Sequence, residues 1–244
     1  MLPKSLITLL VGLLSVASAS AQQSCYFLTI DQVPNSTLLL PPPPADSSAH
    51  FAYDLEQYLW GKSLRDTPRG QLAADDAQLD DAGLTAAFSE AFGIDINPTD
   101  TPEIYRLITG MREDAGDLST RHAKNHYMRK RPYIYFDENT CVPDAQAGLA
   151  GNGSYPSGHT AKAWATALVL AELNPDRQDQ ILLRGYEMGQ SRVICGYHFQ
   201  SDVDAGRIVG AAVVARLHAD KAFSHQLSKA KREVKRLRKK GLLK

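Results

Sequence analysis

The 244-residue sequence predicts an all-α fold in one compact helical domain. The length, less a short leader, suits one medium domain with a full core. Apolar residues recur at helical spacing through most of the chain, and capping residues or prolines precede these runs. We find no alternating run long enough for a sheet and no internal repeat.

The N-terminus has the pattern of an export signal. Lys4 supplies a positive charge, Leu6–Val16 is a short apolar run, and Ala19-Ser20-Ala21 resembles a cleavage site. The run is shorter than the ~20 residues that span a bilayer. We therefore expect residues 1–21 to be a cleaved signal peptide and the protein to be periplasmic or secreted.

Residues 22–46 are expected to form an extended arm that contains the proline run Pro41–Pro44, and 47–244 the helical domain. Ser48 offers an N-cap for a first helix, Ala49–Leu64. One face of this helix is predicted to carry Phe51, Leu55, Tyr58 and Leu59.

Seven further helices are predicted by spacing, caps and first-turn prolines. They cover Pro68–Gln78, Asp81–Phe92, Glu103–Arg131, Thr160–Leu173, Pro175–Met188, Asp202–His218 and Lys221–Lys240. Within the third of these, Gly110 and Gly116 are weak points. Tyr133–Phe136 is short, aromatic and β-like, and a loop follows it to Ser157.

The formal net charge is zero, so no whole-protein field implies a nucleic-acid or membrane partner. Residues 229–244 nevertheless carry nine Lys or Arg and one Glu. A solvated basic helix face explains this tail better than a polyanion-binding element.

Lys124 and Arg131 are candidate phosphate ligands. Seven residues turn a helix by about 700°, within ~20° of two full turns, so both are expected to project from one face. Two cations on one face form an anion clamp, with a planar fork from arginine and a point charge from lysine. The alternative is a solvated basic patch, because Arg129 and Lys130 are adjacent.

A second candidate is the turn Tyr155-Pro156-Ser157-Gly158-His159. Ser157 can cap the helix that follows, and Gly158 lets backbone N–H groups approach an anion at the positive helix end. An ordinary capped helix start explains the serine and the glycine. It does not explain His159 in the first turn, where the dipole disfavours an imidazolium.

A third candidate is Ser191-Arg192 followed by His198 and Asp202. The last two are four residues apart, so on a helix they can touch. A carboxylate on one ring nitrogen fixes the tautomer and frees the other nitrogen as a nucleophile. A structural His–Asp pair is the alternative, but all three candidates in one exported chain favour phosphate chemistry.

Together these residues resemble the three-part signature of the type 2 phosphatidic acid phosphatase (PAP2) superfamily, which includes vanadium haloperoxidases. Segments outside the three motifs, such as Gly153-Ser154-Tyr155 and the four prolines, resemble those of the class A bacterial acid phosphatases in this superfamily. The resemblance covers essentially the whole mature chain and implies an all-helical enzyme that hydrolyses small phosphomonoesters with broad specificity, with phosphotransfer to alcohols as a side activity.

The resemblance also assigns roles. His198 would attack phosphorus to form a phosphohistidine, Asp202 would orient His198, and His159 would serve as acid and then base. The phosphate oxygens would be held by Lys124, Arg131, Ser157, Gly158 and Arg192. No cofactor or metal is expected, and an acidic optimum follows if His159 must begin protonated.

Several alternatives stay open. A vanadium haloperoxidase, a lipid phosphatase and a non-enzymatic polyanion-binding protein are less well supported. Glu113 either contacts the substrate beyond the phosphate or pairs with a clamp cation. His122 and His126 could chelate zinc but face away from Lys124 on one helix. The oligomeric state, including a homo-oligomer, is undetermined.

Export implies an oxidising compartment, so disulfides are expected. The three cysteines are Cys25, Cys141 and Cys195, and the simplest count is one pair and one remaining thiol. We favour Cys141 with Cys195, because both lie in the part of the chain that carries the candidate site residues.

Overall fold

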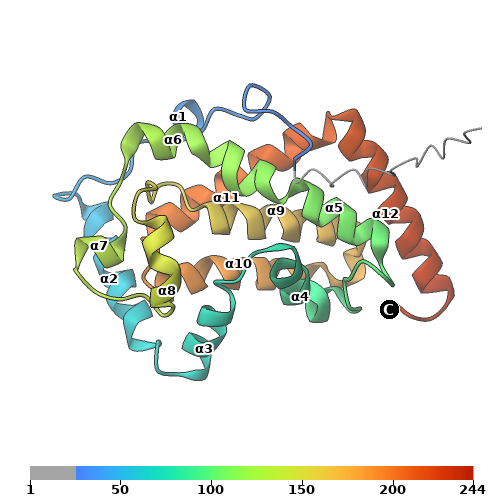
Figure 1. The fold of residues 1–244 in the computed structure, drawn as a ribbon, viewed down its shortest axis with the longest axis horizontal. Coiled ribbons are helices and arrows are strands. Elements are labelled where there is room, and N and C mark those ends of the chain that lie inside the picture. The colour runs from blue at the N-terminus through green and yellow to red at the C-terminus, as the bar shows by residue number, and fades with distance from the viewer. Residues whose placement is uncertain (1–25, 244) are drawn as a thin grey trace, which may run out of the picture.

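The computed structural model describes residues 26–243, and every regular element among them is a helix (Figure 1). The all-α prediction is confirmed for this part of the chain. The expected signal peptide, its cleavage site and Cys25 lie outside the described residues. The α-helices are α1 (Ser36–Leu39), α2 (Ala49–Ser63), α3 (Pro68–Asp75), α4 (Asp81–Phe92), α5 (Pro102–Glu113), α6 (Ser119–Tyr127), α7 (Pro132–Tyr135), α8 (Pro143–Gln146), α9 (Gly158–Leu173), α10 (Gln178–Ile194), α11 (Gln200–His218) and α12 (Lys221–Lys239).

Helix α9 is the central helix, with α10 and α11 packed along it. Its alanines at 161, 163, 165 and 167 are fully buried, and such small side chains let the neighbouring helices approach closely. The core continues into α4 and α5 through Phe88, Phe92 and Leu107. This packing fixes where the N-terminus of α9 lies relative to the start of α11.

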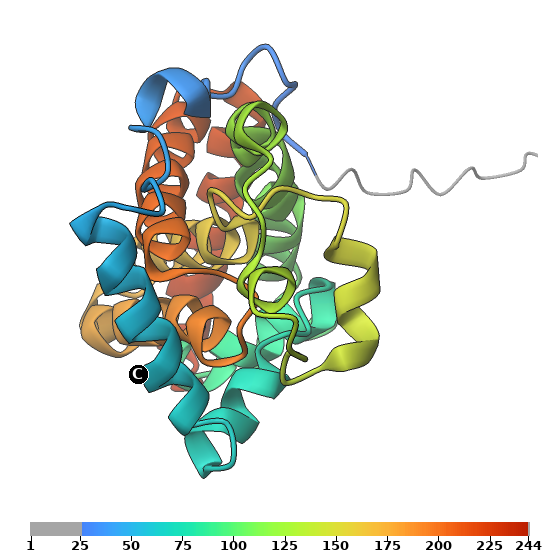
Figure 2. The ribbon, with the colours of Figure 1, turned by 90° about the vertical axis from the view of Figure 1, so that its left-hand side faces the viewer.

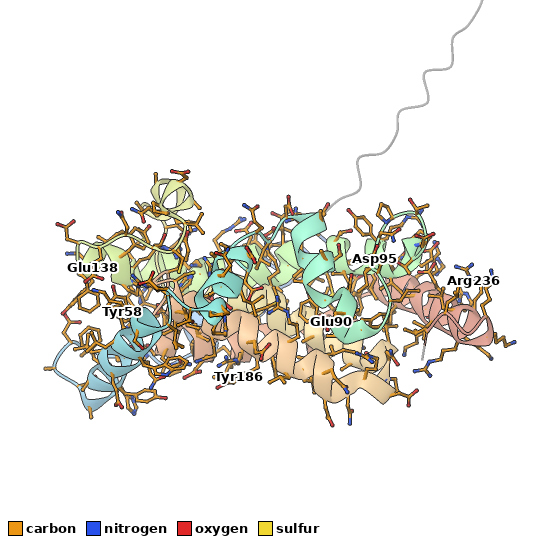
Figure 3. All side chains as sticks on the ribbon, turned by 90° about the horizontal axis from the view of Figure 1, so that it is seen from below. Tyr58, Glu90, Asp95, Glu138, Tyr186 and Arg236 are labelled. Atoms are coloured by element: carbon orange, nitrogen blue, oxygen red, sulfur yellow. The ribbon has the colours of Figure 1, made fainter. Side chains whose placement is uncertain are left out.

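The bundle has two distinct ends. Helices α2 and α7 lie at one end and α12 lies at the other (Figure 1). Viewed onto the first end, α2 stands on one side and α8 on the other (Figure 2). Figure 3 shows Tyr58 and Glu138 together at this end, where Tyr58 Oη donates to Glu138 Oε2 at 2.6 Å, and Arg236 at the opposite end. The predicted site residues gather near the α2 and α7 end.

The described part of the N-terminal arm lies along the domain and includes the short helix α1. The backbone N–H groups of Phe27 and Leu28 donate to Asp114 at 2.8 and 3.0 Å. Further along, Tyr155 Oη donates to the carbonyl of Pro41 at 2.9 Å. The arm is therefore fastened beside the predicted site as well as to the core.

The chain is helical without a break from Pro102 to Tyr127, as predicted for most of Glu103–Arg131, but the prediction that the helix reaches Arg131 is wrong. Helix α5 runs into a π-helix, Asp114–Leu118 (η1), and α6 then ends at Tyr127 because Met128 takes a left-handed conformation with φ 43°. A π-helix inserts an extra residue into a turn and so changes which side chains share a face. This π-helix lies before Lys124, and it is the end of α6 at Tyr127 that leaves Arg131 beyond the helix that carries Lys124.

Two smaller predictions are also wrong. Tyr133–Phe136 is not β-like, because Pro132 begins the short helix α7 and the extended Arg131 precedes it. On α2 the predicted cap Ser48 accepts a hydrogen bond from the Phe51 N–H at 3.1 Å. Leu59, however, does not share the buried face, since it is 64% exposed.

Candidate active site

A cavity of about 180 Å³ opens where η1, α6, the start of α9 and the turn before α11 meet. Six of the predicted site residues line it: Glu113, Lys124, Arg131, Gly158, His159 and His198. Ser157, Arg192 and Asp202 are buried outside this lining. The structure thus brings together residues from four segments that are separate in the sequence.

Lys124 and Arg131 meet at the cavity, but not because they share a helix face. Backbone carbonyls of one loop hold both: Lys124 Nζ donates to Gly153 O at 2.6 Å, and Arg131 Nε donates to Leu149 O and Asn152 O at 3.1 Å. Burial, reinforced by Arg131, lowers the pKa of Lys124 to about 7. Burial also lowers the pKa of Arg131. A bound anion would favour the charged form of each cation.

The start of α9 supplies backbone donors and a histidine. Ser157 is the N-cap and accepts from the Thr160 N–H at 3.3 Å. At Gly158 a Cβ would lie 2.4 Å from the Gly116 carbonyl, so the glycine is also needed for close packing on η1. His159 lies in the first turn, and burial, followed by the charges of Arg192 and others, lowers its pKa well below the usual histidine value.

His198 lies in the turn that joins α10 to α11, so the expectation of a His–Asp pair within one helix is wrong. Gly196, with φ 76°, allows the left-handed conformation that this turn requires. Asp202 is in the first turn of α11, and its Oδ2 accepts the Phe199 N–H at 2.9 Å. The carboxylate therefore caps its own helix as well as facing the histidine.

The contacts of His198 define its tautomer. Arg131 Nη1 lies 3.1 Å from His198 Nε2, and a guanidinium can only donate. Nε2 must then hold a lone pair, so the proton of the neutral ring is on Nδ1. Burial, reinforced by Arg131 and opposed by Asp202, lowers the pKa of His198 well below its usual value and keeps the ring neutral.

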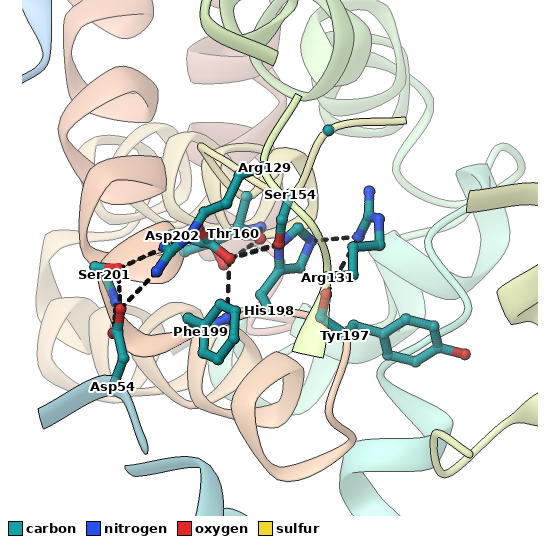
Figure 4. Close-up of polar contacts among 12 residues, drawn as sticks. Asp54, Arg129, Arg131, Ser154, Thr160, Tyr197, His198, Phe199, Ser201 and Asp202 are labelled. Atoms are coloured by element: carbon teal, nitrogen blue, oxygen red, sulfur yellow. Dashed lines mark hydrogen bonds and ion pairs between the residues drawn. The ribbon is translucent and has the colours of Figure 1, made fainter. Parts of the chain in front are cut away.

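Ser154 lies between His198 and Asp202 (Figure 4). Its Oγ donates to Asp202 Oδ2 at 2.6 Å and lies 3.1 Å from His198 Nδ1, whereas the direct distance from Nδ1 to Oδ2 is 3.5 Å. The Nδ1–H group can donate a hydrogen bond to Ser154 Oγ, and the Ser154 hydroxyl in turn donates to the carboxylate. Burial alone would raise the pKa of Asp202, but Arg129 and His198 outweigh it and hold that pKa well below its usual value.

Arg192 is buried behind the cavity, where its guanidinium stacks on Tyr197 at 4.1 Å from the ring centroid. Burial lowers its pKa to about 10. Its Nε and Nη1 are buried and have no hydrogen-bond partner among residues 26–243. Buried donors without an acceptor destabilise the folded protein, and a phosphate oxygen would accept hydrogen bonds from them.

Glu113 lines the cavity and pairs with cations outside the predicted clamp. Its Oε1 lies 2.8 Å from Lys162 Nζ and 2.9 Å from Arg112 Nη1. Lys162 also lines the cavity, three residues after His159, and sequence reasoning missed it. His122 and His126 are not among the lining residues.

Cys141 and Cys195 lie side by side as free thiols. The Cys141 N–H donates to the Cys195 carbonyl at 3.3 Å. The pKa of Cys141 is lowered to about 7, chiefly by a hydrogen bond from Cys195, whose own pKa is raised. The disulfide between them remains a prediction.

Comparison with known proteins identifies the family of this chain. The PAP2 superfamily profile matches residues 114–225. The chain is 56% identical to a non-specific acid phosphatase of Providencia stuartii, over 88% of this chain and 86% of that protein. The chain belongs to the class A non-specific acid phosphatases of the PAP2 superfamily. A non-specific acid phosphatase of Salmonella typhimurium is 43% identical with the same coverage, and an acid phosphatase of Zymomonas mobilis is 36% identical over 93% of this chain and 86% of that protein.

The protein is therefore an acid phosphatase. Within residues 26–243 no helix has the length and apolar character needed to cross a bilayer.

Three residues that lie behind the phosphatase site were not predicted from the sequence as part of it: Asp54, Arg129 and Ser154. Arg129 was considered with Lys130 as part of a solvated patch, yet its side chain is 9% exposed and pairs with two acids. Its place beside Lys130 in a basic stretch of the sequence gave no sign of this burial.

Proposed function

We propose that this acid phosphatase hydrolyses phosphomonoesters of broad specificity through a phosphohistidine on His198, without a metal ion. The observation that most supports the mechanism is the contact between Arg131 Nη1 and His198 Nε2. It requires a neutral ring whose Nε2 holds the lone pair, which is the form that can attack phosphorus. The Nδ1 side is meanwhile held by Ser154 and Asp202.

In the first step, His198 Nε2 bonds to phosphorus and the bond from phosphorus to the ester oxygen breaks. Protonated His159 gives its proton to that leaving oxygen. The charge of the transferring phosphoryl group is held by cations and backbone donors, which is where most catalysis of this reaction arises. These ligands are Lys124, Arg131, Arg192, the Gly158 N–H and the Ser157 hydroxyl.

In the second step, neutral His159 removes a proton from water as the water oxygen attacks phosphorus. The P–N bond to His198 breaks, inorganic phosphate leaves, and His198 returns to its neutral form. An alcohol in the place of water would yield a new phosphate ester, which is the proposed phosphotransferase side activity. Three cations supply the charge that metal ions supply in other phosphatases.

Glu113 is proposed to face the part of the substrate beyond the phosphate. It lies in the cavity wall with Lys162, and its pairing with Lys162 and Arg112 holds it in place. A carboxylate there can accept a hydrogen bond from a sugar or alcohol hydroxyl of the leaving group.

The test compares wild type with His198→Ala on p-nitrophenyl phosphate in the presence of EDTA. Wild type should turn over normally and, after rapid quenching with a ³²P-labelled ester, carry acid-labile, base-stable label. His198→Ala should show neither activity nor label. Unchanged turnover in His198→Ala would refute the nucleophile, and loss of wild-type activity in EDTA would refute metal independence.

The proposal includes export and a disulfide. Cleavage after residue 21 would place the enzyme in the periplasm or medium, where Cys141 and Cys195 can be oxidised. The mature N-terminus should be Gln22, and non-reducing peptide mapping should recover the two cysteines as one cross-linked fragment. Recovery of both as free thiols from the exported enzyme would eliminate this pairing.

A further inference from the structure

A buried acid on α2 reaches the start of α11. Asp54 is fully buried, and its Oδ1 accepts the Ser201 N–H at 2.8 Å while its Oδ2 accepts the Ser201 hydroxyl at 2.6 Å (Figure 4). Ser201 is in the first turn of α11, so Asp54 caps that helix from outside. Helix α2 precedes the matched region 114–225, so this acid is not one of the residues in the superfamily match.

Arg129 connects Asp54 to the active-site carboxylate. Its Nη2 lies 2.8 Å from Asp54 Oδ2, and its Nη1 lies 2.6 Å from Asp202 Oδ1. The guanidinium also stacks over Phe199 at 4.5 Å from the ring centroid. Because each carboxylate takes a different nitrogen of one rigid planar group, the two acids are fixed relative to each other.

The two oxygens of Asp202 have separate tasks. Oδ1 pairs with Arg129, whereas Oδ2 accepts from Ser154 Oγ and the Phe199 N–H. Since Ser154 contacts His198 Nδ1, the direction in which Oδ2 points sets the orientation of the reacting ring. A shift of Arg129 would therefore be transmitted through Asp202 to His198.

We propose that Asp54 and Arg129 are positioning residues for the phosphatase reaction, which hold Asp202 toward Ser154 and His198 and fix the net charge beside that ring. The proposal rests on the nucleophilic role proposed for His198. Two carboxylates and one guanidinium give this cluster a net charge of −1. It lies in a buried region where charges are weakly screened, so a change of one unit is felt by a neighbouring titratable group.

The charge can be moved in both directions by near-isosteric substitutions. Arg129→Gln changes the cluster to −2, Asp54→Asn changes it to 0, and the double variant returns it to −1. More negative charge favours the imidazolium of His198, and less disfavours it. The other charged or titratable groups around His198 are unchanged in all three variants: Lys124 on α6, Arg131 before α7, His159 on α9 and Arg192 on α10.

The experiment measures the ¹⁵N chemical shifts of the His198 ring against pH by NMR in the unliganded enzyme. In parallel, kcat and KM are measured for p-nitrophenyl phosphate. Assignment uses His198→Gln. We expect the His198 pKa to rise in Arg129→Gln, to fall in Asp54→Asn and to return toward wild type in the double variant. Each single variant should lower kcat on the order of 10- to 100-fold, as for a catalytic group displaced by a fraction of an ångström, with little change in KM.

Glu233→Gln is the matched control. Glu233 is also buried, caps the start of α5 through the Glu103 and Ile104 N–H groups at 3.0 and 2.9 Å, and pairs with Arg236. The Glu233→Gln substitution should lower the melting temperature without changing kcat or the pKa of His198. If Arg129→Gln does not fold, Arg129→Lys serves instead: it keeps the charge, so kcat should fall with the titration unmoved.

The proposal is overturned if Asp54→Asn and the Arg129 variant show the same kcat and the same His198 titration as Glu233→Gln. Its failure is distinguishable from that of the proposed function. The predicted NMR shifts without a trapped phosphoenzyme in wild type would refute the phosphohistidine alone. A trapped phosphoenzyme with unmoved shifts and unchanged kcat would refute the positioning role alone.

Discussion

At each end of the bundle, a buried acid caps the start of a neighbouring helix, but the two acids have different surroundings. At one end Asp54 caps α11 from a neighbouring helix, and at the other Glu233 caps α5. Each acid is buried and pairs with an arginine. As helix caps, the two should contribute similarly to stability, on the order of 1 kcal/mol each.

The difference lies in what each arginine contacts next. Arg129 is buried and continues to Asp202, beside a titratable ring. Arg236 is 51% exposed and lies 3.4 Å from its acid, and its neighbours on α12 pair with surface acids, as Lys231 does with Glu172 at 2.7 Å. A capping pair becomes part of an active site when its charge is buried next to a reacting group, because water no longer screens it.

The largest expected effect comes from breaking the chain of contacts at Asp202. Asp202→Asn keeps the shape but presents an amide, which cannot accept from both Arg129 and Ser154 in the native geometry. The ring should then favour the wrong tautomer, and kcat should fall by about 10³- to 10⁴-fold. Steady-state kinetics on p-nitrophenyl phosphate measure this, with circular dichroism as a check of folding. A loss of less than tenfold would contradict the role of the carboxylate.

Ser154→Ala should have a smaller effect at the same end. Nδ1 and Oδ2 are already 3.5 Å apart, so a small movement would restore a direct hydrogen bond after the hydroxyl is lost. We expect kcat to fall on the order of 10- to 100-fold. In the Asp202→Asn background the same substitution should cost almost nothing further, since the two residues act as one unit. Additive losses in the double variant would show that Ser154 acts independently.

The opposite end should respond in stability alone. Glu233→Gln keeps one acceptor but loses the charge, so the free energy of unfolding should fall by about 1–3 kcal/mol. Because α12 lies far from the cavity, kcat should stay within about twofold of wild type. Urea titration and kinetics on the same preparation measure both quantities. A tenfold loss of kcat at full folding would remove the distinction between the two ends.

Local features of the fold were predictable because they depend on neighbouring residues. Helix α4 has the predicted bounds, with Asp80 as its N-cap and the left-handed Gly93 at its end. The three signature segments also predicted residues that line one cavity. Such features rest on turn chemistry and short spacings, which the sequence displays directly.

Long-range features were not predictable in the same way. The π-helix has no clear sequence signal beyond Gly116. The left-handed Met128 ends α6 at Tyr127, and this invalidated the argument that joined Lys124 to Arg131 through one helix face. Asp54 and Arg129 are 75 positions apart, and their pairing depends on how α2 packs on α11. An arginine among other basic residues looks solvated until the fold buries it.

Two lysine–glutamate pairs allow the last and smallest contrast. Lys162 pairs with Glu113 in the cavity wall, whereas Lys231 pairs with Glu172 on the far surface. Burial lowers the pKa of His159, and the charges of Arg192 and Lys162 lower it further. Since His159 must be protonated to act as an acid, kcat/KM should fall as pH rises through that lowered pKa, which gives an acidic optimum.

Lys162→Gln removes one of these positive charges. The pKa of His159 should rise, and the basic limb of kcat/KM should move to higher pH by less than about one unit. The profile is measured on p-nitrophenyl phosphate, whose own ionisation is the same for every variant. Lys231→Gln, which removes an equal charge from the far surface, should leave the limb in place. A limb that stays fixed in Lys162→Gln, or moves to lower pH, would show that His159 is not the proton donor whose pKa limits the reaction.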